Sequence, residues 1–118
     1  MTESFDTIWE EILRCLRNRR DISTLTRRER NEIIAVNNDA IIVKSEKTGT
    51  ERVLKKEEIR FAVEKLLESG TLSLEDLSPR LIGKRAIILA ILFHCLPHVE
   101  RVTGRSSIRY LGQRQNSE

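Results

Sequence analysis

The sequence predicts an α+β fold: an N-terminal helix, a small antiparallel β meander and then a winged helix-turn-helix unit. Three observations predict this class. Apolar residues recur at helical spacing near the N-terminus, β-branched segments alternate with turn residues in the middle, and a helix, short helix, helix and hairpin follow residue 54. Because 118 residues suit one core, we expect a single winged-helix-like domain over residues 1–112 and a disordered tail over residues 113–118.

The N-terminal helix is predicted over residues 3–18, with Ser4 as its N-cap. Its apolar residues recur every three or four positions, which is the spacing of one helical face. Because such a face normally packs into a core, we interpret Trp9 as a core residue. The residues of this face are Phe5, Ile8, Trp9, Ile12, Leu13 and Leu16.

The β meander is predicted between this helix and residue 54. Asn37-Asn38-Asp39 is expected to form its central turn, because Asn and Asp tolerate the left-handed region. A second turn is expected at Lys47-Thr48-Gly49-Thr50. The strands are rich in β-branched residues. They are predicted over residues 22–26, 32–36, 40–45 and 51–54.

The segment from Leu54 to Leu111 carries the winged-helix prediction. Its first helix is expected over residues 56–69, and Gly70 ends it because a C-terminal cap needs a positive φ. A short helix follows over residues 74–77. Ser78-Pro79 ends this helix, because the residue before a proline avoids helical dihedral angles.

The third helix is predicted over residues 80–95, and the strands of a wing over residues 99–102 and 108–111, around a glycine turn. Residues 86–93 are apolar on every side, so something must cover this part of the helix. Either the rest of the chain covers it or a second copy does, which would give a two-fold dimer. Burial within the monomer is the more economical arrangement.

Positive charge gathers in the last third of the chain. The formal net charge is +3, yet seven basic residues and two acidic residues follow Pro79. A clustered basic face is typical of a nucleic-acid-binding protein, and a winged helix places its third helix in the major groove. We therefore predict contacts with double-stranded DNA from the start of the third helix and from the wing. These residues are Arg80, Lys84, Arg85, Arg101, Arg105 and Arg109.

A second basic cluster lies earlier in the chain, after the N-terminal helix. It is either a second set of phosphate contacts or ordinary surface charge, since cations favour the C-terminal end of a helix. Its members are Arg19, Arg20, Arg27, Arg28 and Arg30.

We expect no enzymatic chemistry, cofactor or metal. The sequence has no glycine-rich phosphate loop, no HExxH motif and no CxxC motif. His94, Cys95 and His98 lack the paired spacing of a zinc site. Cys15 and Cys95 do not look like a disulfide framework, and we interpret both as small apolar residues of helical faces. The alternative, a metal-dependent nuclease, would use Asp39, Lys44 and Glu46 on neighbouring β positions.

Several short patterns resemble a small domain attached to prokaryotic restriction nucleases of the HNH and phospholipase D types. The resemblance covers residues 20–111 and implies a DNA-related accessory role in bacteria or archaea. It carries over no catalytic residue, because the motifs of those nucleases are absent. The matching patterns are Ile22-x-Thr24-Leu25, Asn31-x-Ile33, Leu66 with Gly70-Thr71-Leu72, and Leu96-Pro97-x-Val99.

The sequence as a whole favours a non-catalytic protein that binds double-stranded DNA, as a regulator or a restriction-associated module. A protein-interaction or dimerisation module without nucleic acid is the alternative, because fold does not settle function. We expect a cytoplasmic protein with no membrane contact and no small-molecule substrate, since the longest apolar run is far shorter than the ~20 residues of a membrane span. Few aromatic residues and dense mixed charge suit a thermophile.

Overall fold

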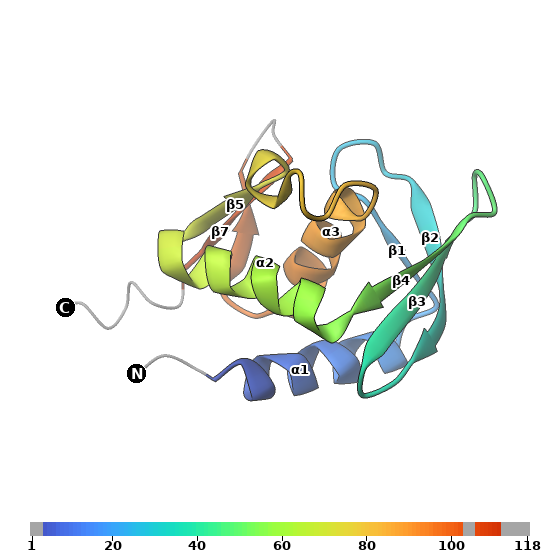
Figure 1. The fold of residues 1–118 in the computed structure, drawn as a ribbon, viewed down its shortest axis with the longest axis horizontal. Coiled ribbons are helices and arrows are strands. Elements are labelled where there is room, and N and C mark those ends of the chain that lie inside the picture. The colour runs from blue at the N-terminus through green and yellow to red at the C-terminus, as the bar shows by residue number, and fades with distance from the viewer. Residues whose placement is uncertain (1–3, 103–105, 112–118) are drawn as a thin grey trace.

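The computed structural model describes residues 4–102 and 106–111. These residues form three α-helices and two antiparallel sheets, so the predicted α+β class is confirmed (Figure 1). The first helix, α1 (Phe5–Arg17), begins at the predicted N-cap, where the Ser4 side chain accepts a hydrogen bond from the Thr7 amide. Its apolar face is buried, including Trp9, which is 2% exposed. The indole Nε1 of Trp9 donates to the Asn38 carbonyl, 3.1 Å away.

The first sheet is the predicted meander. Its strands are β1 (Asp21–Ser23), β2 (Arg30–Val36), β3 (Ala40–Ser45) and β4 (Glu51–Lys55), in the order β1-β2-β3-β4. The β2–β3 register shifts between Ile33 and Ala35, which is a β-bulge. The turn between these strands forms differently from the prediction. Asn37 Oδ1 accepts hydrogen bonds from the amides of Asp39 and Ala40, and no residue of the turn has a positive φ.

The second half begins directly after β4 with α2 (Lys56–Ser69), whose bounds agree with the prediction. Gly70 caps it at φ 81°, in the left-handed region that glycine adopts without strain. Then come β5 (Thr71–Ser73), a 3-10 helix (Glu75–Leu77), α3 (Arg85–Cys95), β6 (Val99–Arg101) and β7 (Ser107–Tyr110). These strands form the second sheet, in the order β5-β7-β6.

The third helix is shorter than predicted: it begins at Arg85 instead of Arg80. Residues 79–84 form turns, and Gly83 has a φ of 89°, which a right-handed helix cannot include. The short helix before it is also a 3-10 helix and not an α-helix. Arg80 and Lys84 therefore lie in a loop that leads into α3.

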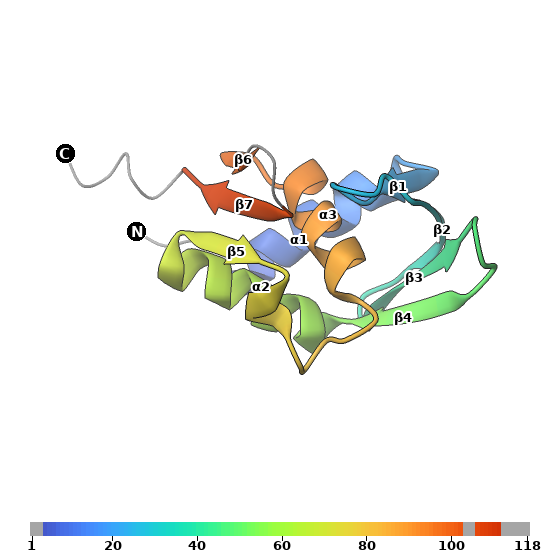
Figure 2. The ribbon, with the colours of Figure 1, turned by 90° about the horizontal axis from the view of Figure 1, so that it is seen from above.

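Helix α3 lies in the centre of the molecule. It packs against α1, α2, β1, β6 and β7, and Figures 1 and 2 show it enclosed by these elements. Residues 87–92 are at most 4% exposed, so the helix is covered on all sides by its own chain. Its burial needs no second copy. Ala86, at the start of the helix, is exposed.

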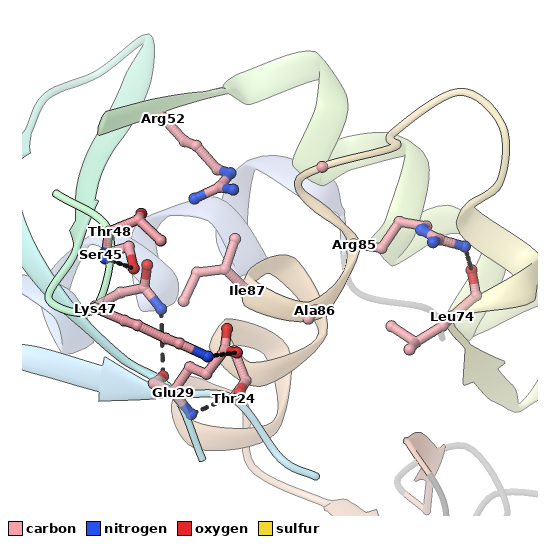
Figure 3. Close-up of a pocket in the computed structure, with 12 residues that line it drawn as sticks. Thr24, Glu29, Ser45, Lys47, Thr48, Arg52, Leu74, Arg85, Ala86 and Ile87 are labelled. Atoms are coloured by element: carbon pink, nitrogen blue, oxygen red, sulfur yellow. Dashed lines mark hydrogen bonds and ion pairs between the residues drawn. The ribbon is translucent and has the colours of Figure 1, made fainter. Parts of the chain in front are cut away.

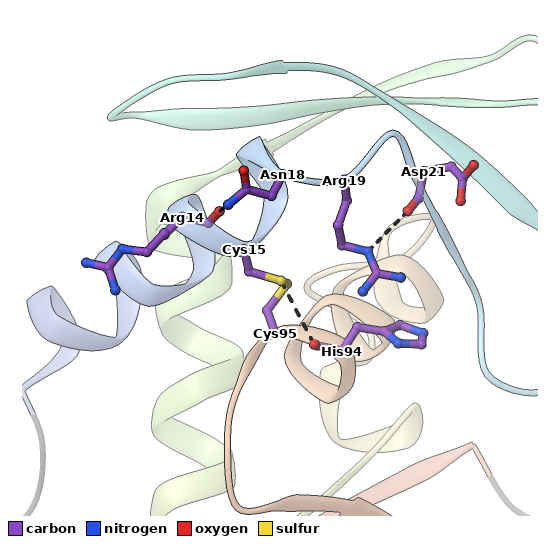
Figure 4. The surroundings of a disulfide bond; sticks show 7 residues. All are labelled: Arg14, Cys15, Asn18, Arg19, Asp21, His94 and Cys95. Carbon is purple, nitrogen blue, oxygen red and sulfur yellow. Dashed lines mark hydrogen bonds between the residues drawn. A yellow bond between two sulfur atoms is a disulfide. The ribbon is translucent and has the colours of Figure 1, made fainter.

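The two cysteines form a disulfide between the C-terminal ends of α1 and α3, which corrects the prediction that they are unpaired apolar residues. Cys15 and Cys95 lie 80 positions apart in the sequence, with 5.5 Å between their Cα atoms (Figure 4). Each cysteine does lie on a helix, as predicted, and the structure places both near the C-terminal ends of these helices. The sequence does not show that these two helix ends meet in the fold.

Within residues 4–102 and 106–111, no helix is both long enough and apolar enough to cross a membrane.

Candidate nucleic-acid interface

The predicted recognition helix has little surface to offer to DNA. Because residues 87–92 are buried, only the two ends of α3 are accessible to a ligand. A helix that reads the major groove needs an exposed face along several turns. A DNA-binding surface on this protein would therefore consist of loops and side chains around this helix.

The basic residues before α3 are mostly engaged within the chain. Lys84 Nζ lies 3.0 Å from both carboxylate oxygens of Glu58, and both side chains are largely buried. The Arg85 guanidinium donates to the Leu74 carbonyl and to the Ser78 hydroxyl. A ligand phosphate would have to compete with these partners.

Arg80 is the more accessible member of this group. It is exposed, and its guanidinium lies over the Phe61 ring, 4.8 Å from the centroid. This cation–π contact leaves the edge of the guanidinium open to solvent.

The arginines of the hairpin lie on opposite faces. Arg109 is the cross-strand neighbour of Glu100, and its Nη1 lies 2.8 Å from Glu100 Oε2. Arg101 is opposite Ile108, which is fully buried, so Arg101 lies on the face turned to the core. Arg101 Nε is buried without a hydrogen-bond partner among the described residues. Arg105, at the expected tip of the wing, lies outside the described residues.

The second predicted cluster is more open. Residues 14–30 contain seven arginines and only two carboxylates. Arg30 makes ion pairs with Asp21 (4.0 Å) and Glu46 (3.8 Å). The other six arginines are exposed and make no ion pair with any described residue. Arg14 points away from Arg19 and Asp21 (Figure 4), and we call the remaining five the arginine cluster. They are Arg17, Arg19, Arg20, Arg27 and Arg28.

The fold places the arginine cluster at the two ends of edge strand β1. Arg17 ends α1, and Arg19 and Arg20 connect it to β1. At the other end, Thr24 and Glu29 close a loop: their backbones pair, and Thr24 Oγ1 accepts from the Glu29 amide at 2.9 Å. Arg27 and Arg28 lie in this loop. Arg28 has a φ of 55°, an uncommon conformation for a non-glycine residue. The sequence predicted a second cluster of Arg19, Arg20, Arg27, Arg28 and Arg30, and of these Arg30 is engaged in ion pairs.

His94 lies next to this cluster, near the end of α3. Burial lowers the pKa of His94 below its ordinary value of 6.5, and the positive charge of Arg19 lowers it further. A hydrogen bond with the Ser23 backbone acts in the opposite direction. Figure 4 shows Arg19 above His94, with its Nε directed to the Asp21 carbonyl, whereas Arg14 points away.

A cavity of about 280 Å³ opens between the first sheet and the start of α3 (Figure 3). Three buried polar residues, Thr24, Asn31 and Ser45, line it. Lys47, Arg52 and Glu29 supply its charged side chains. The cavity was not predicted, because its residues come from distant segments: the β1–β2 loop, strands β2, β3 and β4, the β3–β4 turn and the start of α3.

The alternative nuclease residues are not brought together. Asp39 precedes β3 and Glu46 follows it, so a strand of six residues, roughly 20 Å long, separates them. Glu46 is paired with Arg30. Across the described part of the chain, no three His, Cys, Asp or Glu side chains are grouped so that they could hold a metal ion.

Comparisons with protein-family models, with curated proteins and with solved structures gave no match. The resemblance to domains of restriction nucleases therefore stays a prediction.

Proposed function

We propose that this protein binds double-stranded DNA without catalysis, through phosphate contacts made by the arginine cluster. One observation carries the proposal: five exposed arginines flank a single short strand, and none of them is paired with a carboxylate of a described residue. Arginine forms bidentate hydrogen bonds with phosphate, and unpaired cations can do so without first breaking an ion pair. Among the described cations before α3 and in the hairpin, Lys84, Arg85 and Arg109 are engaged with partners, and Arg101 lies on the face turned to the core. Arg80 is exposed and forms no ion pair with a described residue.

This surface suits binding to the DNA backbone better than reading of base sequence. The buried centre of α3 cannot enter the major groove. Arginines on loops and helix ends can follow phosphates on the outside of a duplex, which gives affinity with little sequence preference.

We also propose that the second half of the chain is a winged-helix variant. Its element order, helix, strand, short helix, helix, hairpin, and its strand order β5-β7-β6 support this relation. In this proposal α3 has become the structural centre of the domain, and α1 and the first sheet cover the face that a winged helix would present to DNA.

A protein-interaction module is the second candidate. Three large apolar side chains are exposed, Ile34 (44%), Val53 (44%) and Ile82 (65%), and single apolar residues of this kind are common on surfaces.

A cytoplasmic, restriction-associated role in a thermophile remains part of the proposal. The disulfide is compatible with that setting, since intracellular proteins of hyperthermophiles are rich in disulfides.

The test is duplex binding measured by fluorescence anisotropy at several salt concentrations. The wild-type affinity should fall steeply with salt, and the triple variant Arg20→Gln, Arg27→Gln, Arg28→Gln should lower the logarithmic slope by roughly 2.5 to 3, because each phosphate contact contributes about 0.9. The matched control is a triple variant of other exposed cations, Lys44→Gln, Lys55→Gln, Arg60→Gln.

If both triple variants lowered the logarithmic slope equally, the effect would come from the net charge of the protein. This result would contradict the assignment of DNA binding to the arginine cluster. No salt-dependent duplex binding by the wild type would contradict the function and favour the interaction module.

A further inference from the structure

The buried polar side chains of the described residues gather at one place. They are Thr24 (7% exposed), Asn31 (5%) and Ser45 (7%), and all three line the cavity of about 280 Å³ between the first sheet and α3 (Figure 3). The rest of the buried core is apolar. Polar groups are costly to bury unless they find hydrogen-bond partners, so a cavity that collects them suits a polar ligand.

These side chains present donors to the cavity. Thr24 Oγ1 accepts from the Glu29 amide at 2.9 Å, and Ser45 Oγ accepts from the Thr48 amide at 3.3 Å. Each hydroxyl therefore already receives a hydrogen bond, and neither donates its own proton to a described residue. Asn31 Nδ2 donates to the Glu29 carbonyl, which leaves its second N–H available. A ligand with several acceptor oxygens would satisfy all three.

The charge at the cavity is positive. Arg52, on β4, extends toward Ile87 in Figure 3 and makes no ion pair with a described residue. Lys47 Nζ lies 4.0 Å from a Glu29 oxygen, so this pair is roughly neutral. The start of α3 adds backbone amides, because its N-cap, Lys84, supplies no side-chain hydrogen bond and the first turn holds no acidic residue. Arg85 also lines the cavity, but its guanidinium donates to the Leu74 carbonyl (Figure 3).

We propose that this cavity binds a phosphate monoester, with Arg52, Thr24, Asn31 and Ser45 as its ligands. The volume is at the small end of ligand sites, which suits a phosphate group and part of the group attached to it. A second cavity of about 340 Å³ shares four residues with the first and has a more apolar lining, including Leu25 and Leu89. Arg27 of the arginine cluster borders this second cavity, which has room for a nucleoside.

The phosphate monoester is either a free nucleotide or the 5′ end of a nucleic-acid strand. Calorimetric titrations with inorganic phosphate, with a nucleoside 5′-monophosphate and with the matching nucleoside test the site. Parallel titrations with 5′-phosphorylated and 5′-hydroxyl duplexes identify the source of the phosphate. We expect the monophosphate to bind and the nucleoside not to bind.

The variant Arg52→Gln should weaken the binding of the monophosphate by roughly tenfold or more, because a hydrogen bond to a charged group is lost. Arg52→Lys should retain part of the affinity for the monophosphate, because it keeps the positive charge. The matched control is Arg60→Gln, on α2, which changes an exposed cation that lies outside both cavities. Unfolding curves of each variant establish that its fold is intact.

A preference for the 5′-phosphorylated duplex would support the site with a strand end as its ligand, and binding of the free monophosphate alone would support it with a nucleotide. Equal binding of nucleoside and monophosphate, or equal affinities of Arg52→Gln and Arg60→Gln, would overturn it. Of the substituted cluster arginines, Arg20 and Arg28 line neither cavity. The variants Arg20→Gln and Arg28→Gln therefore test DNA binding separately from this site.

Discussion

Cys15 and Cys95 join the last turn of α1 to the last turn of α3, across 80 positions of sequence. The bond ties the N-terminal helix to the buried helix at the centre of the core. It also holds the end of α1, and with it Arg19 of the arginine cluster, close to His94 (Figure 4). One covalent bond thus connects the core to the proposed DNA-binding surface.

Loss of this disulfide should lower the free energy of unfolding markedly. A cross-link across 80 residues restricts the unfolded chain, and loop-closure entropy gives about 4–5 kcal/mol for a loop of this length. Denaturant unfolding with and without a reductant measures the difference. The double variant Cys15→Ser, Cys95→Ser should be as unstable as the reduced protein and insensitive to the reductant. An equal free energy of unfolding for the wild type with and without the reductant would contradict the prediction.

His94 should make the protein less stable in mild acid. Its pKa is lower in the folded state than in the unfolded chain, so the unfolded chain binds more protons between the two values. Stability is therefore fully present above about pH 6.5 and declines as the pH falls through the folded pKa. The variant His94→Gln should remove this part of the pH dependence. Unfolding free energies at several pH values measure it.

Arg19 should be one cause of the low pKa of His94. The variant Arg19→Gln removes the positive charge and should raise the pKa of His94, though not to its ordinary value, because burial is the larger cause. An NMR titration of the His94 ring protons measures the shift. The comparison variant is Arg14→Gln, whose side chain points away from His94 (Figure 4). An identical titration in wild type and Arg19→Gln would exclude this interaction.

The ion pair between Lys84 and Glu58 should stabilise the fold more than an exposed pair does. Their side chains are 26% and 21% exposed, and both carboxylate oxygens accept from Lys84. A double-mutant cycle with Lys84→Met and Glu58→Gln should give a coupling of about 1–2 kcal/mol, between the values of exposed and buried pairs. The control cycle is Arg60–Glu64, an exposed pair, for which about 0.3–0.5 kcal/mol is expected. Equal couplings would contradict the difference in burial.

Ile91→Asp should unfold the protein. Ile91 is fully buried within one chain, and an unpaired buried charge costs several kcal/mol. The matched control is Ile82→Asp, at a residue that is 65% exposed, where a change within about 0.5 kcal/mol is expected. Circular dichroism and sedimentation distinguish unfolding from dissociation. A folded Ile91→Asp monomer derived from a wild-type dimer would show that a second copy covers α3.

The sequence by itself determined the elements whose signals are local. The bounds of α2 and β3 agree with the prediction, because the apolar spacing of α2 ends at a glycine cap and β3 is a run of β-branched residues between turns. The burial of α3 also followed from its composition, since a helix without a polar face must be covered on all sides.

Only the tertiary structure decided which cations are free and where polar groups meet. The sequence predicts that Lys84 and Arg109 contact DNA. In the structure Lys84 is paired with Glu58 at 3.0 Å, and Arg109 is paired with Glu100 at 2.8 Å. The Cys15–Cys95 bond and the cavity likewise join residues from distant segments. Periodicity and turn chemistry act over a few residues, so they can be recognised in a single segment of the sequence. Ion pairs, disulfides and cavities depend on how whole elements pack, so no single segment determines them.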